Sequence, residues 1–176
     1  NNCGGMRDPQ AGLAVHNVEA MDVALYDGTR LSVGWMDESQ FVERSRQPGR
    51  EGELFTTHRE FRNRHAALIR ARMPELPRRV SGYNLDELLP NAEGRFNLAR
   101  ALVGTEGTCV TMLEATVRLV DYYEERVVVA IGYEDVTEAG DHVMTVLPFE
   151  PLAVEGMDQR LYDHVVRKNM PQERYL

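Results

Sequence analysis

Two short glycine-rich segments carry the residue types best suited to holding a cofactor. The first is Asn1-Asn2-Cys3-Gly4-Gly5, and the second is Gly104-Thr105-Glu106-Gly107-Thr108. Glycines let the main chain approach a ligand closely, and the N–H groups of such loops can bind anionic or carbonyl oxygens. A glycine-rich loop taken alone is also typical of a strained turn between strands. The composition of each loop therefore leaves both interpretations open.

Two side chains in or beside the second loop invite a chemical role. Glu106 could serve as a general base, but a glutamate inside a cofactor loop more often fixes that loop by accepting main-chain N–H bonds. Cys109 follows the loop directly. We interpret it as a small buried hydrophobic residue, because free cysteines usually pack in this way.

Other familiar chemistries have no support in the sequence. His58 and His65 lie two turns apart on one predicted helix, too far apart to share a metal without other ligands, and no HExxH or CxxC motif occurs. The second loop lacks the Lys-Ser/Thr ending of a phosphate P-loop, and no GxGxxG motif is present. We therefore expect no metal site, and we assign no catalytic residue to this chain.

Composition excludes several classes of partner. The net charge is −8, and the basic residues that cluster between Arg44 and Arg79 have acids among them, as on a solvated helical face. This balance argues against a nucleic-acid partner or an anionic membrane. Cys3 and Cys109 cannot supply a disulfide framework, which favours a reducing cytoplasm. No apolar run is long enough to span a bilayer, and no signal-peptide pattern opens the sequence.

The elements between the two loops can be read from hydrophobic periodicity. Alternation over 18–25 predicts a strand, a two-residue Asp27-Gly28 turn follows, and Leu31 and Val33 continue the hairpin. A helix capped by Asp37 is expected to run to about Arg46. Further helices are expected over 51–72 and, briefly, over 85–89.

The second half of the chain is predicted to mix strands and helices. Residues 111–120 alternate cleanly, and the β-branched run RVVVAIGY at 126–133 is typical of a buried strand. The pattern then favours a helix over 135–147, a strand over 151–157 and a helix over 158–168. The fold class is therefore α+β.

The order of these segments resembles the FAD-linked oxidase family, which includes D-lactate and D-2-hydroxyglutarate dehydrogenases and the FAD subunit of glycolate oxidase. RRVSGYNLDELLP at 78–90, then NLARALVGTEGTCVTMLEATVRLV at 97–120, are similar to its Gly-Tyr-x-Leu and Gly-Ser/Thr-Glu-Gly-Thr segments. NNCGG, followed by an Asn-Val-Glu-Ala strand and an Asp-Gly hairpin, resembles its Asn-Asn-Ser-Cys-Gly loop. The family usually has Ser then Cys before Gly, where this chain has Cys3 then Gly4, so no role is given to the thiol.

The resemblance implies a fold, a cofactor and a reaction. Residues 1–120 would be the second part of a PCMH-type FAD-binding domain, an antiparallel sheet with flanking helices. Residues 121–176 would begin an α+β domain that covers the substrate. The enzyme would transfer a hydride from a 2-hydroxy acid such as D-lactate to FAD. The residues expected to contact the cofactor are Asn1, Asn2, Cys3, Gly4, Gly5, Gly104, Thr105, Glu106, Gly107, Thr108, Val110 and Thr111.

The same resemblance implies a longer protein, of which this chain would be an internal fragment. The pyrophosphate loop of the first FAD subdomain would lie upstream, the acid–base residues downstream, and an electron-acceptor domain or subunit elsewhere. A fragment with exposed apolar strands is expected to self-associate, with exchange of Pro151 to Lys168 as one route. The alternative is a catalytically silent α+β interaction module without a cofactor. Flavin that co-purifies with the protein would separate the two.

Overall fold

The computed structural model describes residues 2–4, 11–76, 78–121 and 123–168. The chain divides into two compact units. The described residues of the first unit are 2–4, 12–76 and 78–119. Those of the second unit are 11, 120–121 and 123–168.

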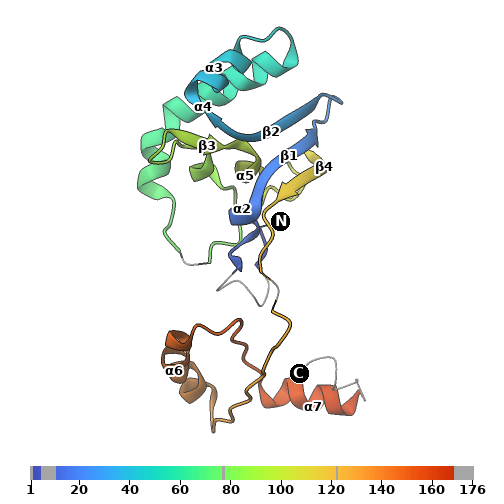
Figure 1. Ribbon diagram of the computed structural model, residues 1–176, viewed down its shortest axis with the longest axis vertical. Coiled ribbons are helices and arrows are strands. Elements are labelled where there is room, and N and C mark those ends of the chain that lie inside the picture. Colours follow the sequence, from blue (N-terminus) through green and yellow to red (C-terminus); the bar gives the residue numbers. More distant parts are fainter. Residues whose placement is uncertain (1, 5–10, 77, 122, 169–176) are drawn as a thin grey trace. The chain divides into compact units, whose positions relative to one another are not determined.

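The first unit is built on a four-stranded antiparallel sheet with the order β3-β2-β1-β4 (Figure 1). β1 pairs with β2 so that Met21 lies opposite Val33 and Val23 opposite Leu31, and all four side chains are buried. Asp22 and Ser32 pair on the other face and are exposed. The period-two pattern therefore put the core on one face of the sheet. The strands are β1 Val18–Ala24, β2 Arg30–Asp37, β3 Arg95–Asn97 and β4 Thr111–Val117.

The turn between β1 and β2 differs from the expected two-residue loop. The Leu25 N–H donates to the Thr29 carbonyl over 2.9 Å, which leaves three residues in the loop. Gly28 has a φ of +84° and its N–H donates to the Leu25 carbonyl. This is the three-residue hairpin in which glycine takes the left-handed position. Asp-Gly thus marked the hairpin correctly but not its loop length.

Helices cover the buried face of the sheet. α3 begins after Asp37, whose carboxylate accepts from the Gln40 N–H, while the Gln40 side chain accepts from the Asp37 N–H. This capping box explains why the predicted start was correct. Phe41 of α3 meets Phe55 of α4 and Phe96 of β3 edge to face. The helices of this unit are α2 Ala14–Asn17, α3 Glu38–Ser45, α4 Arg50–Arg72, the 3₁₀ turn η1 Leu85–Leu88 and α5 Leu98–Leu102.

The second unit holds two helices and a short 3₁₀ turn: α6 Val136–Val146, η2 Leu147–Phe149 and α7 Gln159–Arg167. Asp135 caps α6 through the Thr137 and Glu138 amides, and Asp158 caps α7 through the Leu161 amide. Both helices lie where periodicity predicted them. In the described part of this unit, no residue is in a strand.

The two strands expected in the second unit are therefore wrong. Residues 126–133 form no strand, and Val127 is 89% exposed. Residues 151–157 form no strand either. An apolar β-branched run forms a strand only when a neighbouring strand satisfies its N–H and C=O groups, and the described residues here offer none. β4 likewise ends at Val117, before the expected 120.

The predicted α+β class is confirmed, with a four-stranded antiparallel sheet and flanking helices. The assignment of residues 1–120 and 121–176 to an FAD-binding and a substrate-covering domain stays a prediction. Among the helices that the structure describes, none combines the length and the apolar composition needed to cross a membrane.

Candidate functional site

The second glycine loop is a tight turn with an exposed tip. The Thr108 N–H donates to the Thr105 carbonyl over 2.9 Å, and φ is positive at both central residues, Glu106 (+50°) and Gly107 (+77°). Positive φ at both positions is the requirement of a type I′ turn. Thr105 is buried, whereas Glu106, Gly107 and Thr108 are exposed. The turn therefore presents its main chain to solvent.

Threonine hydroxyls hold this turn. Thr108 Oγ1 donates to the Thr105 carbonyl over 2.6 Å, and Thr105 Oγ1 donates to the Leu102 carbonyl over 2.8 Å. Tyr26, at the tip of the β1–β2 hairpin, donates its hydroxyl to the Gly107 carbonyl over 3.0 Å. No described N–H group donates to the Glu106 carboxylate. The side-chain bonds that fix the loop thus come from residues other than the expected glutamate.

The left-handed conformation of Glu106 leads to a stability prediction. A residue with a β-carbon is strained there, whereas asparagine tolerates the region. We expect Glu106→Asn to stabilise the chain by about 1 kcal/mol in urea unfolding. Glu93→Asn, at an exposed turn position without positive φ, is the control and should change stability by less than about 0.5 kcal/mol. Equal effects of the two substitutions would mean that Glu106 carries no backbone strain.

The first glycine loop is anchored by a buried asparagine. Asn2 is 1% exposed; its Oδ1 accepts from the Val15 N–H over 3.0 Å, and its Nδ2 donates to the Arg79 carbonyl over 2.9 Å. The Cys3 carbonyl accepts from the Ala14 N–H, and the Gly4 carbonyl accepts from the Arg78 guanidinium. Asn1 and Gly5, which were also expected to contact the cofactor, lie outside the described residues.

The two glycine loops meet each other. Gly104 has a φ of +89°, and a β-carbon built on it would lie 2.9 Å from the Gly82 carbonyl oxygen and 3.4 Å from Cβ of Asn2. Tyr83 shares a 2.6 Å hydrogen bond with Thr108 Oγ1. Residues 2–4, 82–84 and 103–108 therefore converge, although they are far apart in the sequence. The loops that composition singled out are brought together by the fold.

The remaining expected contacts flank this convergence. Val110 is half-buried and packs against the core, and Thr111 is exposed at the start of β4. Cys109 is half-buried and lies 3.8 Å from the Thr108 hydroxyl, so it is more accessible than the predicted buried residue. Cys3 is exposed.

Sequence reasoning missed two polar contributors to this region, the buried Asn84 and the half-buried Arg79. Asn84 is 1% exposed, and its Nδ2 donates to the Val103 carbonyl over 2.6 Å. Arg79 donates through Nη2 to Asn84 Oδ1 over 3.1 Å and to both carboxylate oxygens of Asp86. Asn84 lies within the Gly-Tyr-x-Leu segment, which could have drawn attention to it. Arg79 lies in the same quoted segment, 78–90, but outside its Gly-Tyr-x-Leu motif.

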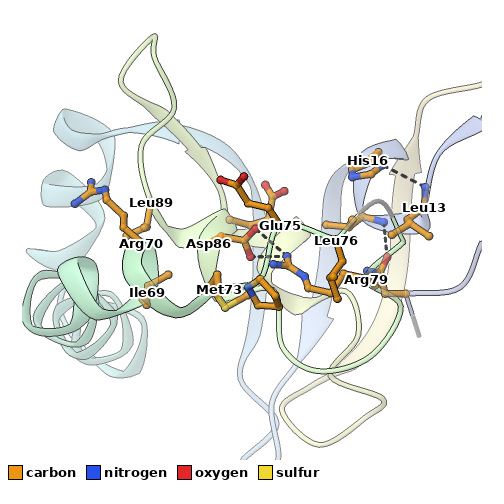
Figure 2. A pocket seen from close by; sticks show the side chains of 14 residues that line it. Leu13, His16, Ile69, Arg70, Met73, Glu75, Leu76, Arg79, Asp86 and Leu89 are labelled. Atoms are coloured by element: carbon orange, nitrogen blue, oxygen red, sulfur yellow. Dashed lines mark hydrogen bonds and ion pairs between the residues drawn. The ribbon is translucent and has the colours of Figure 1, made fainter.

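A pocket of about 520 Å³ adjoins the first loop (Figure 2). Figure 2 shows the Arg79 guanidinium pointing toward the Asp86 carboxylate. The charged lining residues are Arg70, Arg79, Glu75, Asp86 and Glu87, so carboxylates outnumber guanidinium groups. The rest of the lining is Asn2, Leu13, Val15, His16, Ile69, Met73, Pro74, Leu76 and Leu89. The walls are thus a mixture of apolar groups and charges, of which Arg79 and Asp86 form an ion pair.

Burial raises the pKa of Glu87 in this pocket above its ordinary value of 4.5; Arg100 and Arg79 oppose the shift, and Asp86 adds to it. A folded state with a raised carboxyl pKa binds the proton more tightly than the unfolded state does. The stability that this group contributes is therefore present below pH 4.5 and is lost as the pH rises through the raised value.

We accordingly expect Glu87→Gln to stabilise the chain at pH 7 relative to the unmodified protein. The gain should shrink as the pH falls and disappear below about pH 4.5, since both residues are then neutral. Urea unfolding at a series of pH values measures this difference. Glu93→Gln on the surface is the matched control. A gain from Glu87→Gln that is independent of pH would contradict the assignment to ionisation.

The chain is similar to three curated proteins, each called D-2-hydroxyglutarate dehydrogenase. The one from Pseudomonas putida is 30% identical over 146 residues, covering 83% of this chain and 14% of the relative. That from Haemophilus influenzae is 26% identical over 163 residues (89% and 16%), and that from Pantoea ananatis is 28% identical over 114 residues (65% and 11%). The chain thus spans about a seventh of the length of these relatives.

No protein-family model matches the chain, and no solved structure matches it. The relationship therefore rests on these sequence similarities, which extend over most of the chain. They confirm the resemblance read from the glycine loops: the chain is a distant homologue of a segment of D-2-hydroxyglutarate dehydrogenases, of the FAD-linked oxidase family.

Proposed function

We propose that this chain forms part of the FAD-binding domain of a flavin-dependent dehydrogenase that oxidises a 2-hydroxy acid. The relatives are named for D-2-hydroxyglutarate, which makes this compound the first substrate to test and D-lactate the second. The observation that carries the proposal is the convergence of two glycine loops about 100 residues apart in the sequence. A single strained turn would not require a second glycine loop beside it.

The residues of the two loops fit a cofactor of this kind. The exposed turn at 105–108 offers the amides of Glu106 and Gly107, for which the described residues provide no acceptor. Main-chain N–H groups in a left-handed turn favour anionic or carbonyl oxygens. Gly107 leaves open space around the position of a β-carbon, so a ligand could approach the main chain closely. When bound, FAD would accept the hydride at its isoalloxazine.

The chain's own residues would hold and orient the cofactor. Gly104 and Asn2 fix the two loops against each other, and Thr105 and Thr108 set the turn, whose tip residues Glu106 and Gly107 are exposed. We assign no catalytic acid or base to these residues. The proposal places the protein in the cytoplasm and gives it an electron-acceptor domain or subunit elsewhere in the complete enzyme.

The test compares two proteins. In the full-length protein that carries this chain, we expect stoichiometric FAD and bleaching of the flavin absorbance near 450 nm by D-2-hydroxyglutarate or D-lactate. The isolated chain should bind FAD weakly, because several charge-assisted hydrogen bonds of roughly 1.5–3 kcal/mol each would come from outside it. Absorbance spectra after gel filtration measure both. A full-length protein without flavin would instead support the interaction module, and an isolated chain with stoichiometric flavin would show that the cofactor site is complete in these residues.

A further inference from the structure

The two glycine loops are joined by a continuous chain of polar contacts. Asn2 belongs to the first loop, and Asn84 donates to the carbonyl of Val103, directly before Gly104 of the second. Both asparagines are 1% exposed. A buried amide that loses its partner costs more than the bond itself contributes, because its desolvation is not compensated. Each asparagine therefore depends on its partners.

Arg79 is the residue that both asparagines contact. Its main-chain carbonyl accepts from Asn2 Nδ2, and its Nη2 donates to Asn84 Oδ1. Asp86 accepts from the same nitrogen with both oxygens, at 2.6 and 2.8 Å, and so orients the guanidinium (Figure 2). The Arg79 side chain is 19% exposed. One arginine thus links the first loop by its main chain and the second by its side chain.

Little free space surrounds Gly104 where it lies beside the two asparagines. A β-carbon at Gly104 would lie 3.4 Å from Cβ of Asn2 and 3.6 Å from Nδ2 of Asn84. A shift of Asn84 or Asn2 would therefore change the contacts around Gly104. Contacts that share one partner in this way are expected to be energetically coupled.

We propose that Arg79 is a positioning residue that couples the two glycine loops, so that neither keeps its ligand-binding geometry without the other. The connection to flavin rests on the proposed function, whereas the coupling of the loops does not. Arg79 would not touch the reacting atoms. It would set the relative position of residues 2–4 and 103–108 through Asn2 and Asn84.

Hydrogen exchange on the isolated chain tests the coupling without any cofactor. In Arg79→Gln we expect the segments that contain two sets of hydrogen-bonded N–H groups to exchange about tenfold faster together: Val15, which donates to Asn2, and Thr105 and Thr108, which donate to the Leu102 and Thr105 carbonyls. Arg70→Gln is the matched control, because Arg70 lines the same pocket and takes no part in the link. It should leave both segments unchanged. Arg79→Lys should restore part of the protection, since an ammonium can still reach Asp86.

Three outcomes would overturn the proposal: faster exchange in only one of the two segments, no change in either, or an equal rise across the whole first unit, including α4. If Arg79→Gln does not fold, Asp86→Asn takes its place, since it releases the guanidinium without removing it. Asp86→Asn should accelerate hydrogen exchange in the same two segments by a smaller factor. Unchanged exchange in these segments would count against the link.

The effect of Arg79 on the affinity for FAD is measured in the full-length protein. Arg79→Gln should raise the dissociation constant for FAD about tenfold relative to Arg70→Gln, and Arg79→Lys should recover part of that loss. Unchanged FAD affinity with coupled exchange would overturn the role of the link in binding. A full-length protein that binds no FAD would count against the proposed function alone, since the exchange experiment does not involve the cofactor.

Discussion

Valine in place of Gly107 is expected to abolish flavin retention in the full-length protein. Gly107 has a φ of +77° with no atom near the position of a β-carbon, so the substitution strains the turn but meets no neighbour. A branched side chain there would occupy the space through which a ligand reaches the tip amides. Strain at such a position costs on the order of 1–3 kcal/mol, which a folded domain can usually tolerate. The loss of flavin should therefore exceed the loss of stability.

Gly94 supplies a matched control. It also has a positive φ, +76°, with open space around it, but it lies in the turn before β3. Gly94→Val should lower the melting temperature as much as Gly107→Val does while flavin stays bound. Absorbance spectra and thermal unfolding of the two variants decide the matter. Equal flavin content in both would show that the second glycine loop is only a turn.

Gly104 should respond differently from Gly107, although the sequence does not distinguish them. A β-carbon at Gly104 would lie 2.9 Å from the Gly82 carbonyl oxygen, so the main chain itself must move. We expect Gly104→Val to cost at least about 3 kcal/mol and to disturb residues 2–4 and 82–84 as well. Loss of flavin in this variant would therefore reflect the fold as much as the ligand. Gly107 is the better probe of binding.

Local sequence patterns were sufficient to predict an element where its caps and hydrogen bonds come from residues close in the sequence. The helix at 38–45 was predictable from its capping residue, and the β1–β2 hairpin from alternation around Asp27-Gly28. The structure of the run at 126–133 was not predictable in this way. An apolar strand is buried only if it has partners, and local composition does not reveal them. The valines of this run are exposed instead.

In the candidate site too, some features were visible in the local sequence and others depend on tertiary packing. The glycine loops were visible in the sequence because glycine is needed wherever φ is positive, as at Gly104 and Gly107. The burial of Asn2 and its bond to Arg79, 77 residues away, depends on tertiary packing alone. A polar residue at either position is equally typical of a solvated loop. Only the folded chain shows that these residues connect the two loops.

Among the described strands, β4 forms one edge of the sheet. β4 stands at the end of the strand order, with β1 on one side of it. Met112, Leu113 and Val117 of this strand are 58%, 49% and 51% exposed, and Glu114 is its only charged residue. An edge strand with exposed apolar side chains and few charges favours pairing with another chain. Since no strand forms at 151–157, edge pairing replaces the exchange of Pro151 to Lys168 as the expected route.

We expect the isolated chain to dimerise at micromolar concentration through antiparallel pairing of β4 with β4 of a second copy, which is the symmetric arrangement. Burying about 600 Å² of apolar surface contributes about 15 kcal/mol gross at about 25 cal/mol per Å², of which association entropy removes much. The bulge between the Asp22 and Val23 pairings shortens the regular edge and limits the affinity.

Light scattering should give twice the 20.0 kDa of one chain. Met112→Lys should yield a monomer, whereas Leu68→Lys on α4, with an equally exposed parent residue (56%), should remain dimeric. A monomeric unmodified chain at tens of micromolar, or loss of the dimer in both variants, would rule out pairing at this edge.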